Sequence, residues 1–307
     1  MKKVLVTGGA GFIGSHTVDE LLAKGYEVFV VDDLSTGQLK NLKNKKIKFI
    51  KADITDKKKL DLIMKDIDFV IHLAAIASVS ESIKDPIKTH KVNVTGTLNV
   101  FISALENNVK RVVYASSAAV YGNNKKVPLS EDEILNPVSP YGLHKSLKEK
   151  YANLLNKNKQ TEFIGLRYFN VYGPRQSLTG GYPAVIPNFC INILEGETLI
   201  IFGDGKQYRD FVYVKDVAKI NILCLEKSKI KKKVFNVGTG KKIDLNKLIL
   251  TIEKETGIKA KIKKEQEREG DIKKSLANIS KLFKEFKPTL TDFSKGIAET
   301  LEFYRKK

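Results

Sequence analysis

Cysteine is scarce in this sequence, because Cys190 and Cys224 are the only two among 307 residues. They lie far apart and lack the spacing of a zinc site, which argues against a disulfide framework and a cysteine-based metal centre. We therefore expect a reducing compartment, which favours the cytoplasm, and we predict no metal site.

Long hydrophobic runs are also missing. Only three apolar residues follow the N-terminal lysines before the first glycines, which is too few for the apolar core of a signal peptide. No stretch approaches the roughly 20 apolar residues of a membrane-spanning helix. With 42% hydrophobic residues and no repeat or low-complexity linker, the chain is long enough for one large α/β domain and a smaller lobe.

Arginine is rare in a basic sequence, since only six of the 54 lysine and arginine residues are arginine, and the formal net charge is +19. The lysines are scattered, which is typical of solvated surface, so we expect no specific nucleic-acid partner. A basic nucleic-acid binder stays open as an alternative. The local lysine runs are Lys43–Lys48, Lys57–Lys59 and Lys229–Lys233.

A short apolar run, Val4–Val6, ends abruptly in glycines, and a helical pattern begins directly after them. Gly9, Gly11 and Gly14 have the GxGxxG spacing of a dinucleotide-binding turn. In such a turn the glycines let the backbone approach a pyrophosphate, which lies over the unpaired amides of the helix N-terminus. A glycine-rich turn without a ligand is the alternative.

An acidic residue follows the next predicted strand. Tyr26–Val31 predicts a strand, and Asp32 stands at its end, 18 residues after Gly14. A carboxylate there accepts hydrogen bonds from the adenosine ribose and repels the extra phosphate of NADP, so we predict NAD as the cofactor. In the alternative, Asp32 and Asp33 merely end the strand.

The pattern of strand followed by helix then recurs. Strands are predicted at Lys48–Lys51, Asp68–Leu73 and Arg111–Ala115, with a long helix over Pro86–Asn107. This alternation predicts an α/β fold with a doubly wound, Rossmann-type parallel sheet, which binds ligands beyond the carboxyl ends of its strands. Further cofactor candidates at or near these strand ends and in the helix are Asp53, Ile54, Leu73, Ala74, Ala75 and Asn93.

Tyr141 and Lys145 open an amphipathic helix that extends to about Asn156, so they lie one turn apart on one face. A nearby ammonium favours phenolate, which lowers the pKa of the tyrosine toward the working pH. With the serine pair Ser116–Ser117 at the end of the preceding strand, the two residues form a credible acid/base unit.

These motifs, with the others given below, make the chain resemble the extended short-chain dehydrogenases/reductases. Among them it is most similar to the nucleotide-sugar epimerases typified by UDP-glucose 4-epimerase. The motifs span nearly the whole chain in the order of the family. They are Thr7–Gly14 (TGGAGFIG), Ser116–Gly122 (SSAAVYG), Tyr141-xxx-Lys145, Leu166–Pro174 (LRYFNVYGP), Phe202–Gly205 (FGDG), Arg209–Val212 (RDFV) and Arg268–Asp271 (REGD).

The resemblance implies a role for each matching residue. Tyr141 would be the catalytic acid/base, Lys145 would hold the nicotinamide ribose, and Ser117 would share the proton of the sugar O4. Cofactor contacts are implied for Gly8, Gly11, Phe12, Ile13, Asp32 and Tyr168. Contacts to the UDP-sugar are implied for Asn170, Val185, Arg209, Arg268, Asp271 and Ser275.

We place the NAD-binding Rossmann domain at residues 1–169. The substrate lobe is placed mainly at 170–307, partly interleaved with the sheet domain, because glycines and prolines break up the chain there. A homodimer formed through two long helices is the habit of the family.

Two positions bear on the reaction and the sugar. Dehydratases of the family carry an acidic pair directly after the serine, whereas this chain has Ala118–Ala119. Ser275 aligns with the wall beside the sugar C2 substituent, where a small residue is similar to members that accept N-acetyl sugars. We therefore expect C4 epimerisation of UDP-N-acetylglucosamine, with UDP-glucose as a further substrate. A glucose-only epimerase, another nucleotide-sugar reductase, dehydratase or decarboxylase, and an NAD-sensing non-enzyme stay open.

Overall fold

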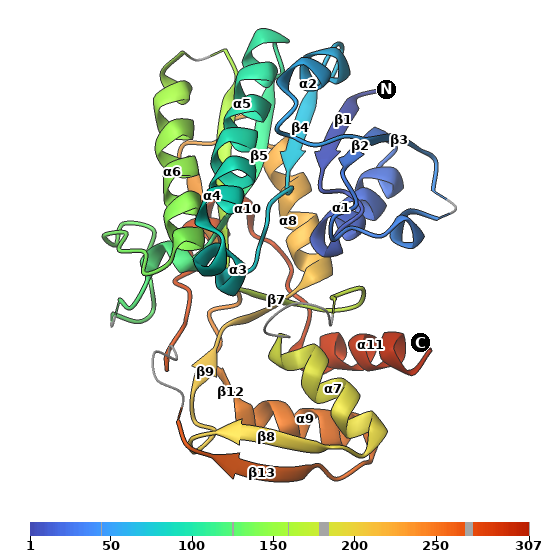
Figure 1. Ribbon diagram of the computed structural model, residues 1–307, viewed down its shortest axis with the longest axis vertical. Helices are drawn as coiled ribbons and strands as arrows, with labels where there is room; N and C mark the ends of the chain where they lie inside the picture. The colour runs from blue at the N-terminus through green and yellow to red at the C-terminus, as the bar shows by residue number, and fades with distance from the viewer. Residues whose placement is uncertain (44, 125, 159, 178–183, 268–272, 307) are drawn as a thin grey trace.

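The computed structural model describes residues 1–43, 45–124, 126–158, 160–177, 184–267 and 273–306. Its larger unit is built on a seven-stranded sheet whose neighbouring strands all run parallel (Figure 1). From edge to edge the strands are β11 (Val234–Val237), β6 (Glu162–Tyr168), β5 (Arg111–Ser117), β4 (Phe69–His72), β1 (Lys3–Thr7), β2 (Glu27–Asp32) and β3 (Ile47–Lys51). The winding direction changes between β1 and β4, and a ligand crevice is expected at their carboxyl ends.

Helices cover both faces of this sheet. One face packs against α1 (Phe12–Ala23), α8 (Val214–Glu226) and α10 (Ser280–Phe286). The other face packs against α2 (Lys57–Ile63), α5 (Thr97–Glu106) and α6 (Pro140–Leu155). Because successive side chains of a strand alternate, Val4 and Val6 enter the first core and Leu5 enters the second. Burial on both faces explains the unbroken apolar run of β1.

The helix predicted over Pro86–Asn107 is divided into three consecutive segments. These are α4 (Pro86–His90), the π-helical segment η2 (Lys91–Gly96) and α5. The Asn93 side chain in η2 donates to the Ile76 carbonyl and accepts from the Ile76 amide, so it ties the chain after β4 to the helix. The remaining short helices are α3 (Val79–Lys84) and the 3-10 turns η1 (Leu39–Leu42), η3 (Ala118–Tyr121) and η4 (Asn156–Asn158).

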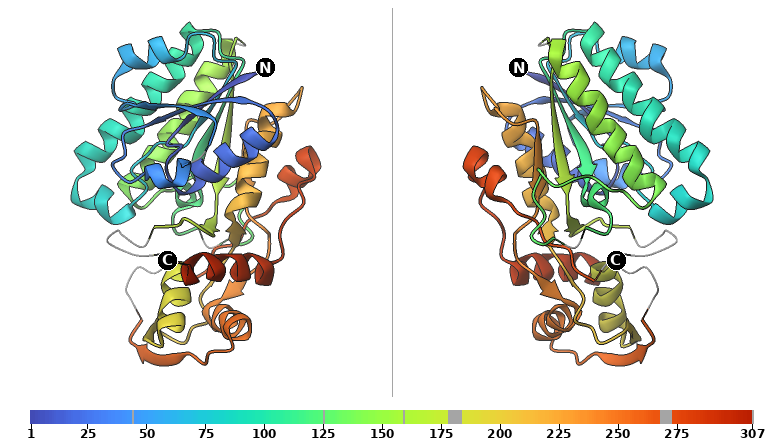
Figure 2. Two further views of the ribbon diagram at one scale, coloured as in Figure 1. Left: turned by 90° about the vertical axis from the view of Figure 1, so that its right-hand side faces the viewer. Right: turned by 90° about the vertical axis from the view of Figure 1, so that its left-hand side faces the viewer.

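A smaller unit lies beyond the carboxyl edge of the sheet (Figure 2). Its hydrophobic core combines α7 (Val185–Glu195), β8 (Thr198–Phe202), α9 (Leu245–Thr256) and α11 (Phe293–Arg305), with β13 (Lys261–Glu265) paired to β8. Two short sheets complete it: β7 (Asn170–Tyr172) with β10 (Phe211–Tyr213), and β9 (Tyr208–Arg209) with β12 (Ile243–Asp244). Between these elements the chain returns to the larger unit to form α8 and β11.

The predicted α/β fold with a doubly wound parallel sheet and a smaller second unit is confirmed. Strand β6, which lies next to the edge strand β11, was not predicted from the sequence. Within the described part of the chain, no helix has both the length and the apolar character needed to cross a lipid bilayer.

Candidate active site

The glycine-rich turn joins β1 to α1 at the carboxyl edge of the sheet. Gly8 has φ +70°, and a Cβ there would lie 2.7 Å from the Ala74 amide nitrogen. A Cβ on Gly14 would lie 2.1 Å from the Gly8 carbonyl oxygen, so the helix can approach the turn only with glycine at both positions. Gly11 is the N-cap of α1, and no side chain among the described residues caps it. The first amides of α1 are therefore free of a side-chain cap and can bind an anion.

Asp32 ends β2 beside this turn and is buried. Its Oδ2 accepts from the Ala10 amide and its Oδ1 from the Leu34 amide, both at 2.9 Å. Burial raises the pKa of Asp32, and the two amides oppose that rise. They use two of the roughly four acceptor positions of a carboxylate, so the fixed side chain can still accept from vicinal hydroxyls. This chemistry fits the ribose of NAD.

The other predicted cofactor residues flank the same edge and differ in their contacts. Asp53 is exposed and accepts from the Thr55 amide, whereas Ile54 is buried against Gly96. Phe12 and Ile13 begin α1. Three half-buried residues follow β4 at the level of Gly8: Leu73, Ala74 and Ala75.

Two predicted cofactor residues have their polar groups engaged within the protein. Asn93 is buried and uses both ends of its amide on Ile76. The Tyr168 hydroxyl donates to Asn221 Oδ1 at 2.6 Å, between β6 and α8.

Ser117, Tyr141 and Lys145 come together from two elements. Ser117 is the last residue of β5, and Tyr141 and Lys145 lie in the first turns of α6. The Ser117 side chain lies close enough to the Tyr141 hydroxyl to favour its ionised form. Lys145 Nζ lies 5.5 Å from the centroid of the Tyr141 ring and donates to the Ala115 carbonyl at 3.0 Å. The arrangement can move a proton between Tyr141 and Ser117 beside a buried amine.

Burial dominates the protonation of this cluster. It raises the pKa of Tyr141, and the nearby Ser117 side chain opposes the rise. It lowers the pKa of Lys145 to about 8, and the Glu149 carboxylate opposes that fall. The sequence predicted a lowered pKa for Tyr141, whereas the structure gives a raised one, because burying a phenolate is costly.

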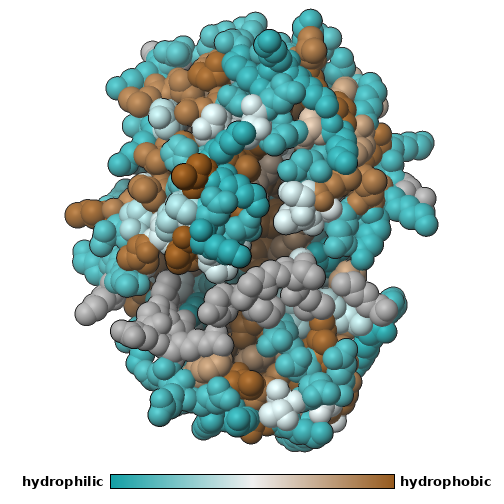
Figure 3. All heavy atoms as spheres, viewed as in Figure 1, coloured by the Kyte–Doolittle hydropathy of each residue, from teal (hydrophilic) through white to brown (hydrophobic). Residues whose placement is uncertain are grey.

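The residues predicted to contact the sugar nucleotide lie where the two units meet. Asn170 begins β7, and its side chain donates to the Asp210 carbonyl at 3.2 Å. Arg209 in β9 donates to the Tyr208 carbonyl, and the Ser275 amide donates to the same oxygen. Val185 begins α7. Arg268 and Asp271 lie outside the described residues. Figure 3 shows a recess with apolar walls between the units.

One residue that sequence reasoning missed organises this region. Asp210 is fully buried, and its carboxylate accepts from the Thr239 amide and hydroxyl and from the Gly240 and Ala277 amides at 2.7–3.1 Å. It therefore fixes the strand that carries Arg209 against the segment that carries Ser275. An acid directly after the arginine of the RDFV motif was the available signal.

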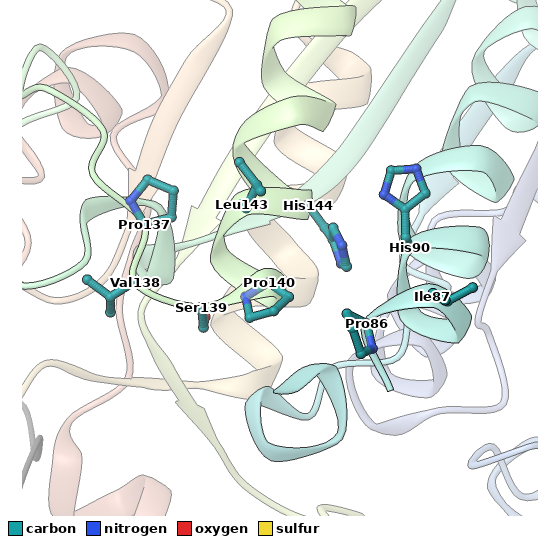
Figure 4. A pocket seen from close by; sticks show the side chains of 9 residues that line it. All are labelled: Pro86, Ile87, His90, Pro137, Val138, Ser139, Pro140, Leu143 and His144. Carbon is teal, nitrogen blue, oxygen red and sulfur yellow. The ribbon is translucent and has the colours of Figure 1, made fainter. Parts of the chain in front are cut away.

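A separate groove lies on the outer side of the α6 N-terminus, between α4 and the loop before α6 (Figure 4). Ile87 and Leu143 border it, and the His90 and His144 rings meet edge to face with centroids 5.4 Å apart. Among the described residues, no three His, Cys, Asp or Glu side chains are grouped to hold a metal ion.

Comparison with known proteins extends these observations. Residues 4–238 match the NAD dependent epimerase/dehydratase family. A putative UDP-glucose 4-epimerase of Methanocaldococcus jannaschii is 42% identical, over 91% of this chain and 90% of that protein.

Solved structures agree with this match over nearly the full length. UDP-N-acetylglucosamine 4-epimerase of Methanobrevibacter ruminantium, in complex with UDP-N-acetylmuramic acid, has a TM-score of 0.94 and 43% identity, covering 99% and 98% of the two chains. UDP-glucose 4-epimerase of Thermus thermophilus, in complex with NAD, has a TM-score of 0.89 and 33% identity, covering 99% of both chains.

Proposed function

Because this chain belongs to the NAD dependent epimerase/dehydratase family, we propose that it is a UDP-sugar 4-epimerase. Its main substrate pair is UDP-N-acetylglucosamine and UDP-N-acetylgalactosamine, and UDP-glucose is a second substrate. The observation that carries the proposal is the cluster of Ser117, Tyr141 and Lys145 beside the glycine-rich turn. The 4-epimerase names of the similar proteins support the reaction class.

Two groups of residues hold the cofactor in this proposal. The Phe12 and Ile13 amides, next to the close backbone approach that Gly8 and Gly11 allow, bind the pyrophosphate, and Asp32 binds the adenosine ribose. Lys145 holds the nicotinamide ribose. Bound NAD supplies reversible hydride transfer at the sugar C4.

The side chains of the cluster handle the proton. Tyr141 reacts as the phenolate and takes the proton of the sugar O4 as C4 is oxidised, and the Ser117 hydroxyl beside it shares that proton. The 4-keto sugar then turns about its diphosphate linkage, and Tyr141 returns the proton when the opposite face of C4 is reduced. A charged Lys145 stabilises the phenolate during the step.

The sugar nucleotide needs a firm anchor because the sugar itself must turn. We assign the diphosphate to Asn170 and Arg209, since a guanidinium binds phosphate through charge-assisted hydrogen bonds. Arg268 and Asp271 are assigned to phosphate and the uridine ribose, and Val185 to the pocket wall.

The choice of sugar rests on Ser275. Its small side chain leaves room beside C2, and the N-acetylglucosamine epimerase named above supports the same choice. Ala118–Ala119 after Ser117 supplies no acid/base pair for the water loss of a dehydratase.

The test is an incubation of the purified protein with UDP-N-acetylglucosamine and, separately, with UDP-glucose, with and without added NAD. Proton NMR resolves the C4 epimers. We expect both sugars to be converted, and Ser275→Tyr to lose the N-acetyl activity while it keeps the glucose activity. Conversion of glucose alone by the wild type, or an unchanged Ser275→Tyr variant, would reject the sugar assignment. Failure with both sugars would reject the epimerase.

We also propose a cytoplasmic homodimer. Support for the dimer comes from α6, whose outer face exposes Leu143, Tyr151 and Leu154, and from Ile87 across the groove. Support for the compartment comes from the two cysteines, which are buried and unpaired with each other.

A further inference from the structure

A buried ion pair lies directly behind the catalytic cluster. Glu149 follows Lys145 by one turn of α6, and Arg167 lies in the neighbouring strand β6. Both are nearly inaccessible, at 7% and 4% exposure. Arg167 donates through Nε to Glu149 Oε1 at 2.9 Å and through Nη2 to Oε2 at 2.7 Å. This two-pronged contact places a permanent positive charge directly against the Glu149 carboxylate.

The same pair is bonded to the strand end that carries Ser117. Ser116, the residue before it, donates its hydroxyl to Glu149 Oε1. Arg167 Nη1 donates to the Tyr121 hydroxyl at 2.8 Å, and Tyr121 ends the turn that follows Ser117. Contacts from one carboxylate and its partner thus hold both sides of Ser117 relative to α6.

The charges around Lys145 make its protonation depend on Glu149. Tyr141 faces Lys145, with its ring centroid 5.5 Å from Nζ. The other titratable groups that feel the charge of Lys145 are Lys148, His144 and His72, and burial lowers the pKa of each. Within the described part of the chain, Glu149 is the group that opposes the loss of the Lys145 proton. Because the pKa of Lys145 is about 8, removing the negative charge of Glu149 changes the fraction of Lys145 that is protonated near neutral pH.

We propose that Glu149 is a positioning residue for the epimerisation: its carboxylate holds the end of β5 that carries Ser117 and places a negative charge one helical turn from Lys145. This inference rests on the proposed function. A merely structural ion pair would stabilise the fold and leave the protonation of Lys145 unchanged.

Two substitutions of Glu149 distinguish these roles. Glu149→Gln removes the negative charge at nearly unchanged size, so the alkaline limb of the kcat profile should move to lower pH by about one unit. Loss of structural support alone would lower kcat and leave the limb in place. Glu149→Asp keeps the negative charge, but its shorter side chain no longer reaches Ser116. We therefore expect kcat to fall about 10-fold while the alkaline limb stays at the same pH.

The profiles are measured with UDP-N-acetylglucosamine from about pH 6 to about pH 9.5, the range in which an acid/base pair near neutrality is visible. A readout without turnover is a titration of lysine labelled with ¹³C at Cε, with the Lys145 signal assigned by its loss in Lys145→Arg. A shift to lower pH in Glu149→Gln, with none in Glu149→Asp, supports the inference. No shift in Glu149→Gln, or equal shifts in both variants, overturn it. If the wild type converts no UDP-sugar, the proposed function fails, and the lysine titration still decides the role of Glu149.

Discussion

Lys148 is a buried amine that the proposed chemistry does not use. Its side chain is 2% exposed, and Nζ has no hydrogen-bond partner among the described residues. Burial lowers its pKa well below the usual 10.5, and the charge of Lys145 lowers it further. A buried donor without a partner costs about 1–3 kcal/mol of folding free energy.

Lys148→Met should therefore raise the free energy of unfolding at neutral pH by about 1–3 kcal/mol. The unfolded chain binds a proton on Lys148 that the native chain lacks, from the lowered pKa up to 10.5. This difference makes the wild type gain stability as pH rises, so the advantage of Lys148→Met should shrink toward pH 10.5.

Urea unfolding at several pH values measures the difference. Lys150→Met is the matched control, because Lys150 is exposed on the same helix, and it should change stability by less than about 0.5 kcal/mol. A Lys148→Met variant less stable than the wild type, or one whose advantage is the same at every pH, would contradict this account.

At the level of elements, the apolar runs of β1, β2, β4 and β5 were sufficient to predict them. β6 was missed because Gly165 and Arg167 interrupt its pattern. A Cβ at Gly165 would lie 2.6 Å from the Tyr114 hydroxyl, and Arg167 is buried only because Glu149 meets it. Both reasons depend on side chains distant in the sequence, so no local pattern contains them.

The candidate site was likewise only partly predictable from the sequence. Local spacing places Tyr141 and Lys145 on one face of a helix, and strand order brings Ser117 to them. Their catalytic roles stay predictions. The hydrogen bonds of Asn93, and those of Asp210 to two separate segments, follow from tertiary contacts that no spacing predicts.

At the scale of the whole molecule, the candidate site lies where two units of the same chain meet. Residues after 170 build most of the smaller unit, but they also supply α8 and β11 to the larger one. This interleaving connects the residues predicted to contact the sugar nucleotide with the unit that carries the glycine-rich turn. Lysines on the exposed edge strand β13 discourage further strand pairing, which is one use of the high positive charge.

The proposed homodimer makes a prediction at this scale. Leu154→Glu places a charge on the outer face of α6 and should convert the dimer to a monomer, because interface cores tolerate unpaired charge poorly. Leu250→Glu is the control, since Leu250 is similarly exposed on α9, in the other unit. Sedimentation velocity measures both variants. A monomeric wild type, or two variants with equal effects, would contradict the dimer through α6.

The central proposal is that Tyr141 is the acid/base of a UDP-sugar 4-epimerase. The most direct measurement is kcat for UDP-N-acetylglucosamine in the wild type, in Tyr141→Phe, and in Tyr151→Phe as a control on the outer face of the same helix. Tyr141→Phe should lose at least about 100-fold, in line with general acid/base catalysis, and Tyr151→Phe should stay close to the wild type. Near-normal turnover by Tyr141→Phe would contradict the account.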